Sequence, residues 1–329
     1  MADVARVAGV SPMTVSRAFK RDASVSTARR EVILRVAEEM GYLFDSTASN
    51  LRSQKSDFVA VTVPSINNAN FADTVRGLTE GLKARGLQIL LGSTDYDEAE
   101  EERLVEQFLR RRPAAIVVTG GKHSDRCRRL LANAGLPVIE TWDLPEQPIG
   151  HVVGFSNATA VRSMVEHFVA KGLTRIAFIG GDVGQDTRGA DRRLGFIAAM
   201  RAHGLPTDRL IAAGQPPISM REGAEAMARL LQSMPDTQAV ICVSDLSAFG
   251  ALTECQRRGV AVPGRISLAG FGDYEIGSVS VPALSTINPF PREIGARTAA
   301  LILDVLDGRR TTPALIQISP ELLIRESSV

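Results

Sequence analysis

The feature that most constrains this 329-residue chain is an alternation, from about residue 57 onward, of short apolar runs with longer stretches of helical periodicity. The runs are rich in β-branched residues and nearly continuous, which is typical of parallel strands covered on both faces. Strands are expected at residues 58–63, 88–91, 115–119, 138–141, 152–155, 175–179, 239–243 and 267–270. Helices are expected at residues 72–85, 98–111, 124–134, 158–170, 190–203, 220–232, 246–258 and 293–306.

Several of these helical stretches end in Gly followed by an apolar residue or Pro, a stop signal that turns the chain back toward the next strand. This repetition of strand and helix predicts an α/β fold with open, doubly wound parallel sheets. Eight or more strands over about 270 residues suit two such sheets better than one. A single barrel is the less favoured alternative.

Residues 1–44 differ from the rest, because they show three helical patterns in quick succession and no strand signal. Gly9 ends the first pattern, and Ser11 followed by Pro12 is a typical start for the second. The residues expected to face inward are Val4, Val7, Ala8, Val15, Ala18, Phe19, Val32, Val36 and Met40. This spacing is that of a helix-turn-helix, whose second helix enters the DNA major groove. A small helical cap with merely solvated basic residues is the alternative.

The charge distribution divides the chain at about residue 56, just before the alternation of strands and helices begins. Residues 1–56 hold nine Lys or Arg against six Asp or Glu, a net charge of +3, which leaves −2 for the remainder of a chain whose total is +1. A basic segment on a mildly acidic body favours a nucleic-acid partner for that segment. Residues 45–56 are mostly polar, with Leu51 as an isolated large apolar residue, and are expected to be a linker.

Other classes of protein find little support in the sequence. The apolar runs are too short for a membrane helix, and no export signal is visible at the N-terminus, so we expect a soluble, cytoplasmic protein. Three cysteines without C-x-x-C spacing argue against a disulfide framework and a zinc site, and we expect no metal. The four histidines are scattered, and no phosphate-binding loop, dinucleotide fingerprint or nucleophile elbow is present. Neither a cofactor nor an enzymatic activity is therefore expected.

The segment Val4-Ala5-Arg6-Val7-Ala8-Gly9-Val10-Ser11-Pro12-Met13-Thr14-Val15-Ser16-Arg17 closely resembles the headpiece signature of the LacI/GalR family of bacterial repressors. Ser244-Asp245 with Ala248-x-Gly250, and Pro282-Ala283-Leu284-Ser285-Thr286-Ile287, are similar to later motifs of that family, so the resemblance runs the length of the chain. The family usually has a Thr cap before the first helix. Here only Met1-Ala2-Asp3 precede it, so Asp3 is expected to cap it in part, and a start further upstream would restore the missing residues.

The resemblance implies a set of DNA contacts. Pro12, Met13 and Arg17 fall at base-reading positions, and the hydroxyls of Ser11, Thr14 and Ser16 would contact phosphates. The linker would be a hinge that becomes helical on the operator, with Leu51 wedged into the minor groove. A Leu51 that packs on the core is less favoured, because no apolar neighbour accompanies it. The remaining expected contacts are Lys20 and Asn50.

Two doubly wound subdomains bind ligands in the crevice at the carboxyl ends of their strands. The motif Asp186-x-Arg188-x-x-x-Arg192 can direct two arginines into this crevice, the alternative being that one or both face water. The resemblance puts Arg192 at the effector-clamping position. Gly272 stands where many sugar- or purine-binding members have Asp, which favours an anionic ligand. The expected effector-binding residues are Asn70, Phe71, Glu140, Arg188, Arg192, Ser244, Asp245 and Asp273, with Trp142 and Asp143 as further lining.

The sequence looks most like the gluconate-utilisation repressors of the family. We therefore expect a homodimeric repressor of sugar-acid catabolism genes that binds a pseudo-palindromic operator under the control of a gluconate or 2-ketogluconate type of effector. A neutral sugar or other metabolite is the alternative effector, and a sugar-binding transport protein, which would need an export signal and no headpiece, is the alternative class. The expected parts are a headpiece (1–44), a hinge (45–56) and a periplasmic-binding-protein-like core (57–329) that dimerises through helices at 73–85 and 98–111. In the core, one subdomain is expected at 57–156 with 288–314 and the other at 157–287 with 315–329.

Overall fold

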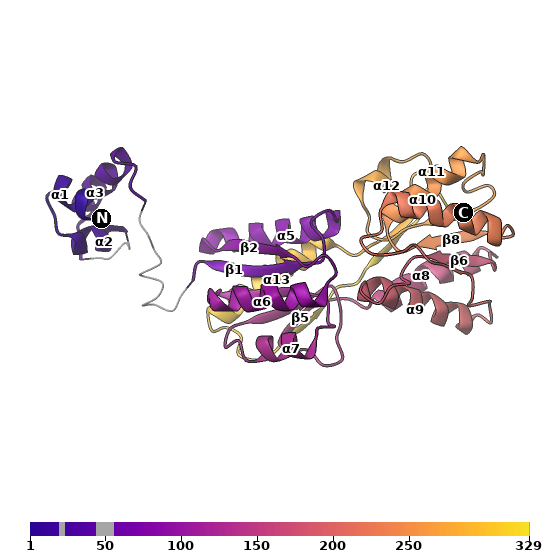
Figure 1. Cartoon of the computed structure of the whole chain (residues 1–329), viewed down its shortest axis with the longest axis horizontal. Helices are drawn as coiled ribbons and strands as arrows, with labels where there is room; N and C mark the ends of the chain where they lie inside the picture. The colour runs from indigo at the N-terminus through magenta and orange to yellow at the C-terminus, as the bar shows by residue number, and fades with distance from the viewer. Residues whose placement is uncertain (20–23, 44–55, 329) are drawn as a thin grey trace. The chain divides into compact units, whose positions relative to one another are not determined.

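The computed structural model describes residues 1–19, 24–43 and 56–328 (Figure 1). Contacts divide the chain into two units, Met1–Ser56 and Asp57–Val329. The expected hinge at 45–56, with Asn50 and Leu51, and the expected contact Lys20 lie outside the described residues, except for Ser56. None of the helices in the described part of the chain is long and apolar enough to cross a membrane.

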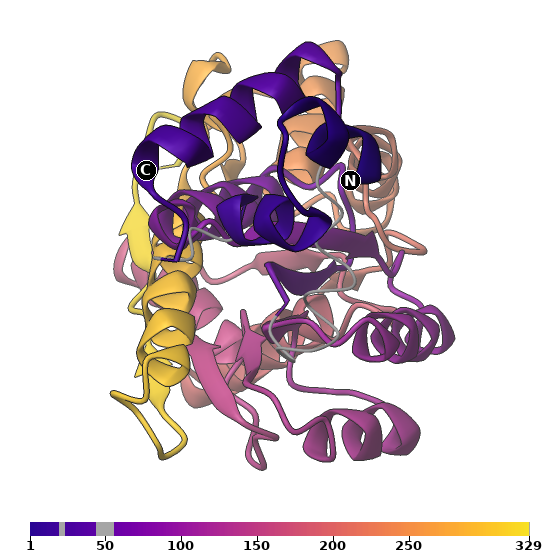
Figure 2. The same ribbon diagram turned by 90° about the vertical axis from the view of Figure 1, so that its left-hand side faces the viewer.

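The first unit consists of three helices, α1 (Ala2–Val7), α2 (Pro12–Phe19) and α3 (Thr27–Glu39), drawn in indigo in Figure 2. They pack around a small core of six buried side chains: Val4, Ala5, Val15, Ala18, Ile33 and Ala37. Phe19 and Tyr42 extend this core with an edge-to-face ring contact at 6.2 Å. The predicted headpiece therefore has the expected helical order.

The buried face of α3 is rotated from the one we predicted. Ile33 and Ala37 are buried, whereas Val32 and Met40 are each more than two-fifths exposed. Arg30 lies on the same side as the buried pair, and its Nε donates to the carbonyl of Ala18 at 2.9 Å. The contact with α2 thus selects the stripe one residue further along, a choice that a short, weakly amphipathic helix leaves open.

The first half of the core is a six-stranded parallel sheet in the order β11-β5-β4-β3-β1-β2. Its strands are β1 (Phe58–Val63), β2 (Gln88–Ser93), β3 (Ala115–Thr119), β4 (Val138–Thr141), β5 (His151–Gly154) and β11 (Leu315–Gln317). One face packs on α5 (Ala69–Leu82) and α13 (Pro291–Leu306), and the other packs on α6 (Glu98–Arg110) and α7 (Asp125–Ala132). A short 3-10 helix, η1 (Lys83–Arg85), continues α5.

The second half is a four-stranded parallel sheet in the order β7-β6-β8-β9. Its strands are β6 (Ile176–Ile179), β7 (Leu210–Ile211), β8 (Ala239–Cys242) and β9 (Ser267–Ala269). Its helices are α8 (Asn157–Ala170), α9 (Thr187–Ala202), α10 (Met220–Ser233), α11 (Asp245–Arg257) and the short α12 (Glu275–Val279). Two doubly wound parallel sheets are therefore confirmed, and β7, β10, β11, β12 and α12 are additions to the predicted elements.

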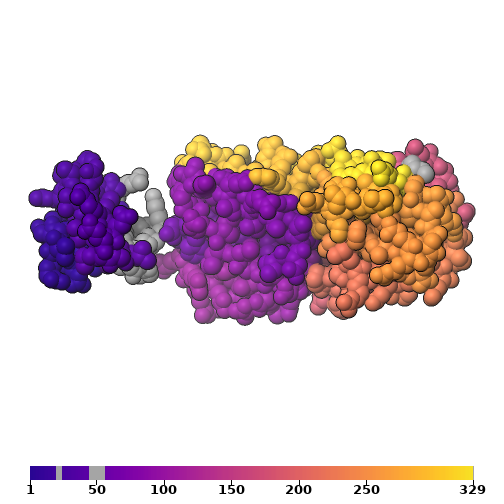
Figure 3. Space-filling model, turned by 90° about the horizontal axis from the view of Figure 1, so that it is seen from above, coloured from indigo at the N-terminus to yellow at the C-terminus, as the bar shows by residue number. Residues whose placement is uncertain are grey.

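One predicted boundary between the subdomains is wrong. We assigned residues 315–329 to the second half, but β11 pairs with β5 in parallel and so belongs to the sheet of the first half. The chain crosses after β11 through an antiparallel pair of β10 (Thr286–Asn288) and β12 (Glu321–Leu323). Residues after β12 then bond to the second half, where Leu268 N donates to Ser327 O at 2.8 Å. Figure 3 shows these C-terminal segments, drawn gold to yellow, on both halves.

Close approach of helix pairs depends on glycine at a few positions. A Cβ at Gly195 in α9 would overlap the carbonyl oxygen of Ala158 in α8. The five predicted Gly helix stops also have the left-handed backbone expected of them: Gly86, Gly135, Gly172, Gly204 and Gly259. These stops return each helix to its sheet, so that the carboxyl ends of both sheets carry the loops described next.

Candidate functional site

In the first unit, one side of α2 is open to solvent at its N-terminal end. Ser11 Oγ accepts a hydrogen bond from Thr14 N at 3.2 Å, so Ser11 caps the helix as the sequence predicted. Ser11, Pro12, Met13 and Arg17 are exposed, and Met13 keeps 59% of its surface. Thr14 and Ser16, the other predicted contacts in this helix, are half-buried at its edge. This is the surface that a helix-turn-helix presents to the major groove.

Asp3 does not cap the first helix. It lies inside α1, where no side-chain cap is formed, and its carboxylate is 3.4 Å from Arg6 Nη2 in an exposed ion pair. An exposed pair three residues apart adds a few tenths of a kcal/mol at most. The first helix is therefore held by Val4 and Ala5 in the core rather than by a cap.

In the core unit, a cavity of about 170 Å³ lies where loops from the carboxyl ends of both sheets meet. Such crevices are the usual ligand sites of doubly wound sheets. The lining residues follow β1, β2, β4, β6, β7, β8 and β9: Ser65, Asn67, Asn68, Asn70, Phe71, Tyr96, Trp142, Asp186, Arg188, Arg192, Pro217, Ile218, Ser219, Val243, Ser244, Leu246, Phe271 and Tyr274. Five of the eight predicted effector residues are among them.

Arg192 is fixed from three sides. Its Nε donates to Asn157 Oδ1 and its Nη1 to the Val243 carbonyl, both at 2.9 Å. Its guanidinium carbon lies 3.6 Å from the centre of the Phe271 ring, a close cation–π contact. Burial lowers the pKa of Arg192 to about 10, and the nearby Asp186 carboxylate opposes that shift. The group remains a cation at neutral pH, held rigidly against the cavity.

Arg188 is held quite differently. It is only 5% exposed, yet among the described residues no acceptor receives a hydrogen bond from its guanidinium. Its guanidinium stands over the ring of Phe71, whose centre is 5.6 Å away, and the Asp143 carboxylate attracts it electrostatically without a hydrogen bond. Buried charges are normally hydrogen-bonded, because an unbonded one forfeits its hydration. Arg188 is therefore a cation in the cavity wall that lacks a hydrogen-bond partner within the described part of the protein.

Aromatic rings form another wall of the cavity. Trp142 contacts Phe71 edge-to-face at 5.4 Å, and its Nε1 donates to Thr74 Oγ1 at 3.1 Å. The backbone of Trp142 is left-handed, with φ of +72°, and Tyr96 has φ of +62°. Non-glycine residues pay about 1–3 kcal/mol for such strained conformations, which gather at ligand-binding sites. Here the strain turns both rings into the cavity at the ends of β4 and β2.

Polar groups bridge the two halves of the core at the cavity. Asn68 caps α5 through its Oδ1, which accepts from Asn70 N at 3.0 Å and from the Tyr274 hydroxyl at 2.7 Å. Tyr274 comes from the second half, so this bond joins the two halves. Burial raises the pKa of Tyr274 and of Tyr96, which keeps both hydroxyls neutral as hydrogen-bond donors.

Three predicted effector residues are not brought into the cavity. Glu140 points to the other face of the first sheet, where its Oε2 accepts from Ile149 N at 2.6 Å. Asp245 accepts from Tyr274 N at 2.8 Å and from Thr286 Oγ1 at 2.7 Å, and so supports a crossover between the halves. Asp273 is paired with Asn288 and Arg325. The structure thus removes these three residues from the predicted lining of the cavity. A residue's position along a strand does not determine which face of the sheet its side chain occupies.

Sequence reasoning missed several lining residues, of which Asp186 is the most informative. It caps α9 through a 3.1 Å bond from Gly189 N and is the carboxylate among the charged lining residues, beside Arg188 and Arg192. The lining is therefore net positive. The sequence signal for Asp186 was its position in the motif Asp186-x-Arg188. Tyr96, Asn68 and Tyr274 carried no sequence signal of their own.

A helix-turn-helix unit attached to a two-part ligand-binding core defines the class of ligand-responsive DNA-binding proteins. Two family models match this chain: "Bacterial regulatory proteins, lacI family" over residues 1–44 and "Periplasmic binding protein-like domain" over residues 165–328. The HTH-type transcriptional regulator GntR of Pseudomonas aeruginosa is 36% identical over 327 residues, which cover 99% of this chain and 94% of that protein. The chain belongs to the lacI family of bacterial regulatory proteins and is a transcriptional repressor of that family.

Solved structures agree with this assignment. A LacI family transcriptional regulator from Silicibacter pomeroyi superposes with a TM-score of 0.92 at 30% identity, covering 99% of this chain and 98% of that one. The complex of the transcriptional regulator CelR with cellobiose gives a TM-score of 0.73 at 27% identity, covering 99% of this chain and 98% of that one. Both predictions, of family and of fold class, are confirmed.

Proposed function

We propose that the effector of this repressor is a sugar acid of the gluconate or 2-ketogluconate type, and that its carboxylate pairs with Arg188. The observation that carries this proposal is a buried guanidinium in the cavity wall without a hydrogen-bond partner among the described residues. A carboxylate would satisfy it with the two parallel hydrogen bonds that a guanidinium fork prefers. A neutral ligand would leave the charge uncompensated.

The rest of the cavity suits the polyol part of such a ligand. Side-chain amides and hydroxyls from both halves are available to sugar hydroxyls: Ser65, Asn67, Asn70, Tyr96, Ser219 and Ser244. The rings of Phe71, Trp142 and Phe271 offer apolar faces to its C–H groups. Small-molecule sites are usually lined by apolar side chains with a few polar groups among them.

We further propose how the effector acts on DNA. A ligand that contacts Arg188 in the second half and Asn70 in the first would favour the closed arrangement of the core and so shift the population of operator-competent molecules. Two headpieces of a homodimer would bind a pseudo-palindromic operator of sugar-acid catabolism genes through Ser11, Pro12, Met13, Thr14, Ser16 and Arg17. The expected dimer contacts are along α5 and α6.

A neutral sugar is the second candidate effector, because the related CelR structure is a complex with cellobiose. A transport protein with this core is disfavoured by the match of residues 1–44 to the lacI family. The two effector classes differ in charge, so matched ligands can separate them.

Isothermal titration calorimetry on the full chain should compare gluconate and 2-ketogluconate with sorbitol, glucose and cellobiose. Sorbitol has the carbon chain of gluconate without the carboxylate, and we expect it to bind at least tenfold more weakly. Arg188→Gln should remove this preference, whereas Arg201→Gln, at the other end of α9 and exposed, should retain it. Binding of a neutral sugar without binding of either acid would overturn the proposed effector class. Operator retardation with and without the ligand tests the regulatory step.

A further inference from the structure

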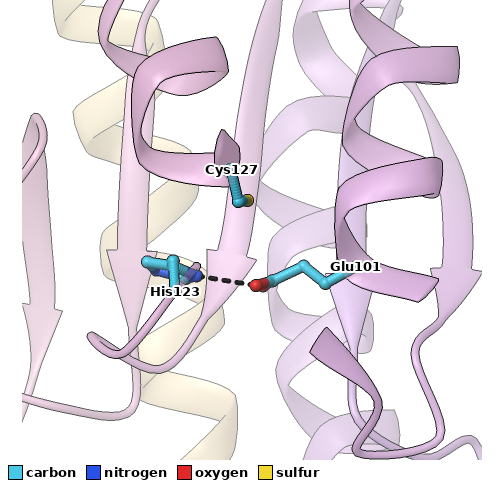
Figure 4. Close-up of side chains that lie close together, drawn as sticks. All are labelled: Glu101, His123 and Cys127. Atoms are coloured by element: carbon cyan, nitrogen blue, oxygen red, sulfur yellow. Dashed lines mark hydrogen bonds and ion pairs between the residues drawn. The ribbon is translucent and has the colours of Figure 1, made fainter. Parts of the chain in front are cut away.

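A cluster of metal-ligand side chains lies in the first half of the core, on the α6 and α7 face of the sheet. Glu101 on α6, His123 in the loop before α7 and Cys127 in the first turn of α7 each offer a ligand atom, and these atoms lie within 4.8 Å of one another (Figure 4). His123 Nδ1 is 2.9 Å from Glu101 Oε2. The side chain of His123 is fully buried, that of Glu101 is 10% exposed and Cys127 is buried.

A second observation concerns the opposite nitrogen of the His123 ring. His123 Nε2 and Glu140 Oε1 are both buried and have no hydrogen-bond partner among the described residues, although they lie only 3.8 Å apart. Native proteins rarely leave such groups unsatisfied. Histidines that bind metals usually donate their other ring N–H to a carboxylate, which orients the ring. Glu140 stands where that carboxylate belongs, at a separation that a small rotation of the imidazole would close.

We propose that Glu101, His123 and Cys127 form a zinc-binding site, with His123 ligating through Nδ1 and Glu140 holding the ring through Nε2. Carboxylate, imidazole and thiolate together are the donor set of zinc, and three protein ligands leave its fourth tetrahedral position to water. We predicted no metal site from the sequence, because the three cysteines have no C-x-x-C spacing. The ligands of the proposed site come from two helices and a loop, so no spaced motif in the sequence marks them.

The local structure presents these ligands in a fixed arrangement. Ser124 caps α7 and its Oγ accepts from Cys127 N at 3.1 Å, which fixes the cysteine one turn after His123. The Ser124 hydroxyl also donates to Glu102 Oε1 at 2.8 Å and so ties α7 to α6 beside Glu101. Glu101 also lines a small cavity of about 40 Å³, whose wall includes Arg188.

Metal binding here must release a proton. A zinc ion deprotonates a coordinating thiol outright. The resulting thiolate and the Glu101 carboxylate neutralise the divalent charge, which makes the occupied site compatible with its burial.

Cobalt provides the direct test, because thiolate ligation gives Co²⁺ an intense near-ultraviolet charge-transfer band. Full-length protein stripped with a chelator and titrated with Co²⁺ should develop this band at one ion per chain and lose it when Zn²⁺ is added. Cys127→Ser should abolish the band and weaken Zn²⁺ binding at least tenfold. The matched control Cys255→Ser, at another buried cysteine outside the cluster, should keep both.

Glu140→Gln supplies a milder second variant, which should retain the charge-transfer band and weaken Zn²⁺ binding by about 10- to 100-fold. Circular dichroism of each variant establishes that it is folded. Absence of the band at saturating Co²⁺ in the wild-type protein, or a band that persists in folded Cys127→Ser, would overturn the proposal. In that case His123 serves only as a bridge between two carboxylates.

Discussion

At the scale of single residues, the two cavity arginines differ in how the surrounding protein holds them. Arg192 donates hydrogen bonds to Asn157 and to the Val243 carbonyl, and its guanidinium stacks on the ring of Phe271. Arg188 stands over Phe71 and donates no hydrogen bond to a described residue. A guanidinium already bonded to the protein positions other groups, whereas an unbonded one is available to a ligand. We therefore expect Arg192 to shape the cavity and Arg188 to bind the ligand.

Asn157 allows a test of the positioning role. It is fully buried, accepts from Arg192 Nε and donates its Nδ2 to the Trp142 carbonyl at 3.0 Å. Asn157→Leu keeps the branched shape of the side chain but leaves both partners unsatisfied, and we expect a loss of about 2–4 kcal/mol in the free energy of unfolding. Urea denaturation measures it, with the exposed Asn133→Leu as control. Equal stability of the two variants would contradict this role.

Asp245 predicts an unusual dependence of stability on pH. Burial raises its pKa to about 6, above the ordinary value that it regains on unfolding. Protonation therefore favours the folded state, and this contribution is present at low pH and lost as the pH rises through about 6. Relative to Asp245→Asn, the wild-type protein should lose about 2 kcal/mol of unfolding free energy between about pH 4 and pH 7. Urea unfolding at both pH values measures the difference, and an unchanged or opposite trend would show that the carboxyl is ionised in the fold.

At the scale of elements, α2 shows how a short helix is made to serve recognition. Ser11 caps it, Val15 and Ala18 anchor it in the core, and the opposite side carries Met13 and Arg17 in solvent. A helix of eight residues is too short to be stable alone, so its order comes from packing against α1 and α3. Its exposed side is the one that we expect to contact DNA.

Arg17 is the side chain on α2 with the reach and charge to read guanine. Arg17→Ala should weaken operator binding at least tenfold, because a bidentate contact with a base contributes about 1–3 kcal/mol. Gel retardation at fixed salt measures this. Arg35→Ala, which removes an exposed arginine from α3, is the control for the loss of one positive charge. If the two variants bound the operator equally, base reading by Arg17 would be excluded.

At the scale of the whole core, the two halves are joined by three chain crossings and a few side-chain bonds. The Tyr274 hydroxyl donates to Asn68 in the wall of the cavity, and Lys122 of the first half forms a 3.0 Å ion pair with Asp191 of the second. The less exposed Tyr274–Asn68 bond is expected to be the stronger of the two, because water screens the exposed ion pair. Under the proposed mechanism, these contacts would favour the closed arrangement.

Tyr274→Phe removes the Tyr274–Asn68 bond between the halves without changing the shape of the ring. We expect three- to tenfold weaker effector binding and a larger radius of gyration of the ligand-free core, because the closed arrangement loses about 1 kcal/mol. Calorimetry and small-angle X-ray scattering measure the two quantities. A variant matching the wild-type protein in both would show that closure does not depend on this contact. Ser280→Ala, in a hydroxyl that bonds only within its own half, is the control.

Much of this molecule could be predicted from local pattern. The eight predicted strands and eight predicted helices of the core all exist, with ends displaced by at most three residues. The apolar pattern of a strand and the glycine that ends a helix are local properties, so they can be recognised in a single sequence. β11 was missed because it is three residues long and is identified only by its pairing with β5.

The site was predictable in part for the same reason. Arg188, Arg192, Asn70, Phe71 and Ser244 follow strand ends, and the structure brings them into the cavity. Glu140 and Asp245 also lie near strand ends, but their side chains turn into buried hydrogen bonds elsewhere. Position along a strand places a residue at an edge of a sheet, and only its neighbours decide where the side chain points.

The sequence by itself determined the family, the division into a basic helical headpiece and a mildly acidic α/β core, and the presence of two arginines after one strand. These follow from composition and from short-range order. Only the tertiary structure decided that Arg188 donates no hydrogen bond to a described residue while Arg192 is fixed, and that Glu101, His123 and Cys127 meet on one face. Whether a charge has a partner depends on residues far away in the chain, and so it becomes visible only when the chain is folded.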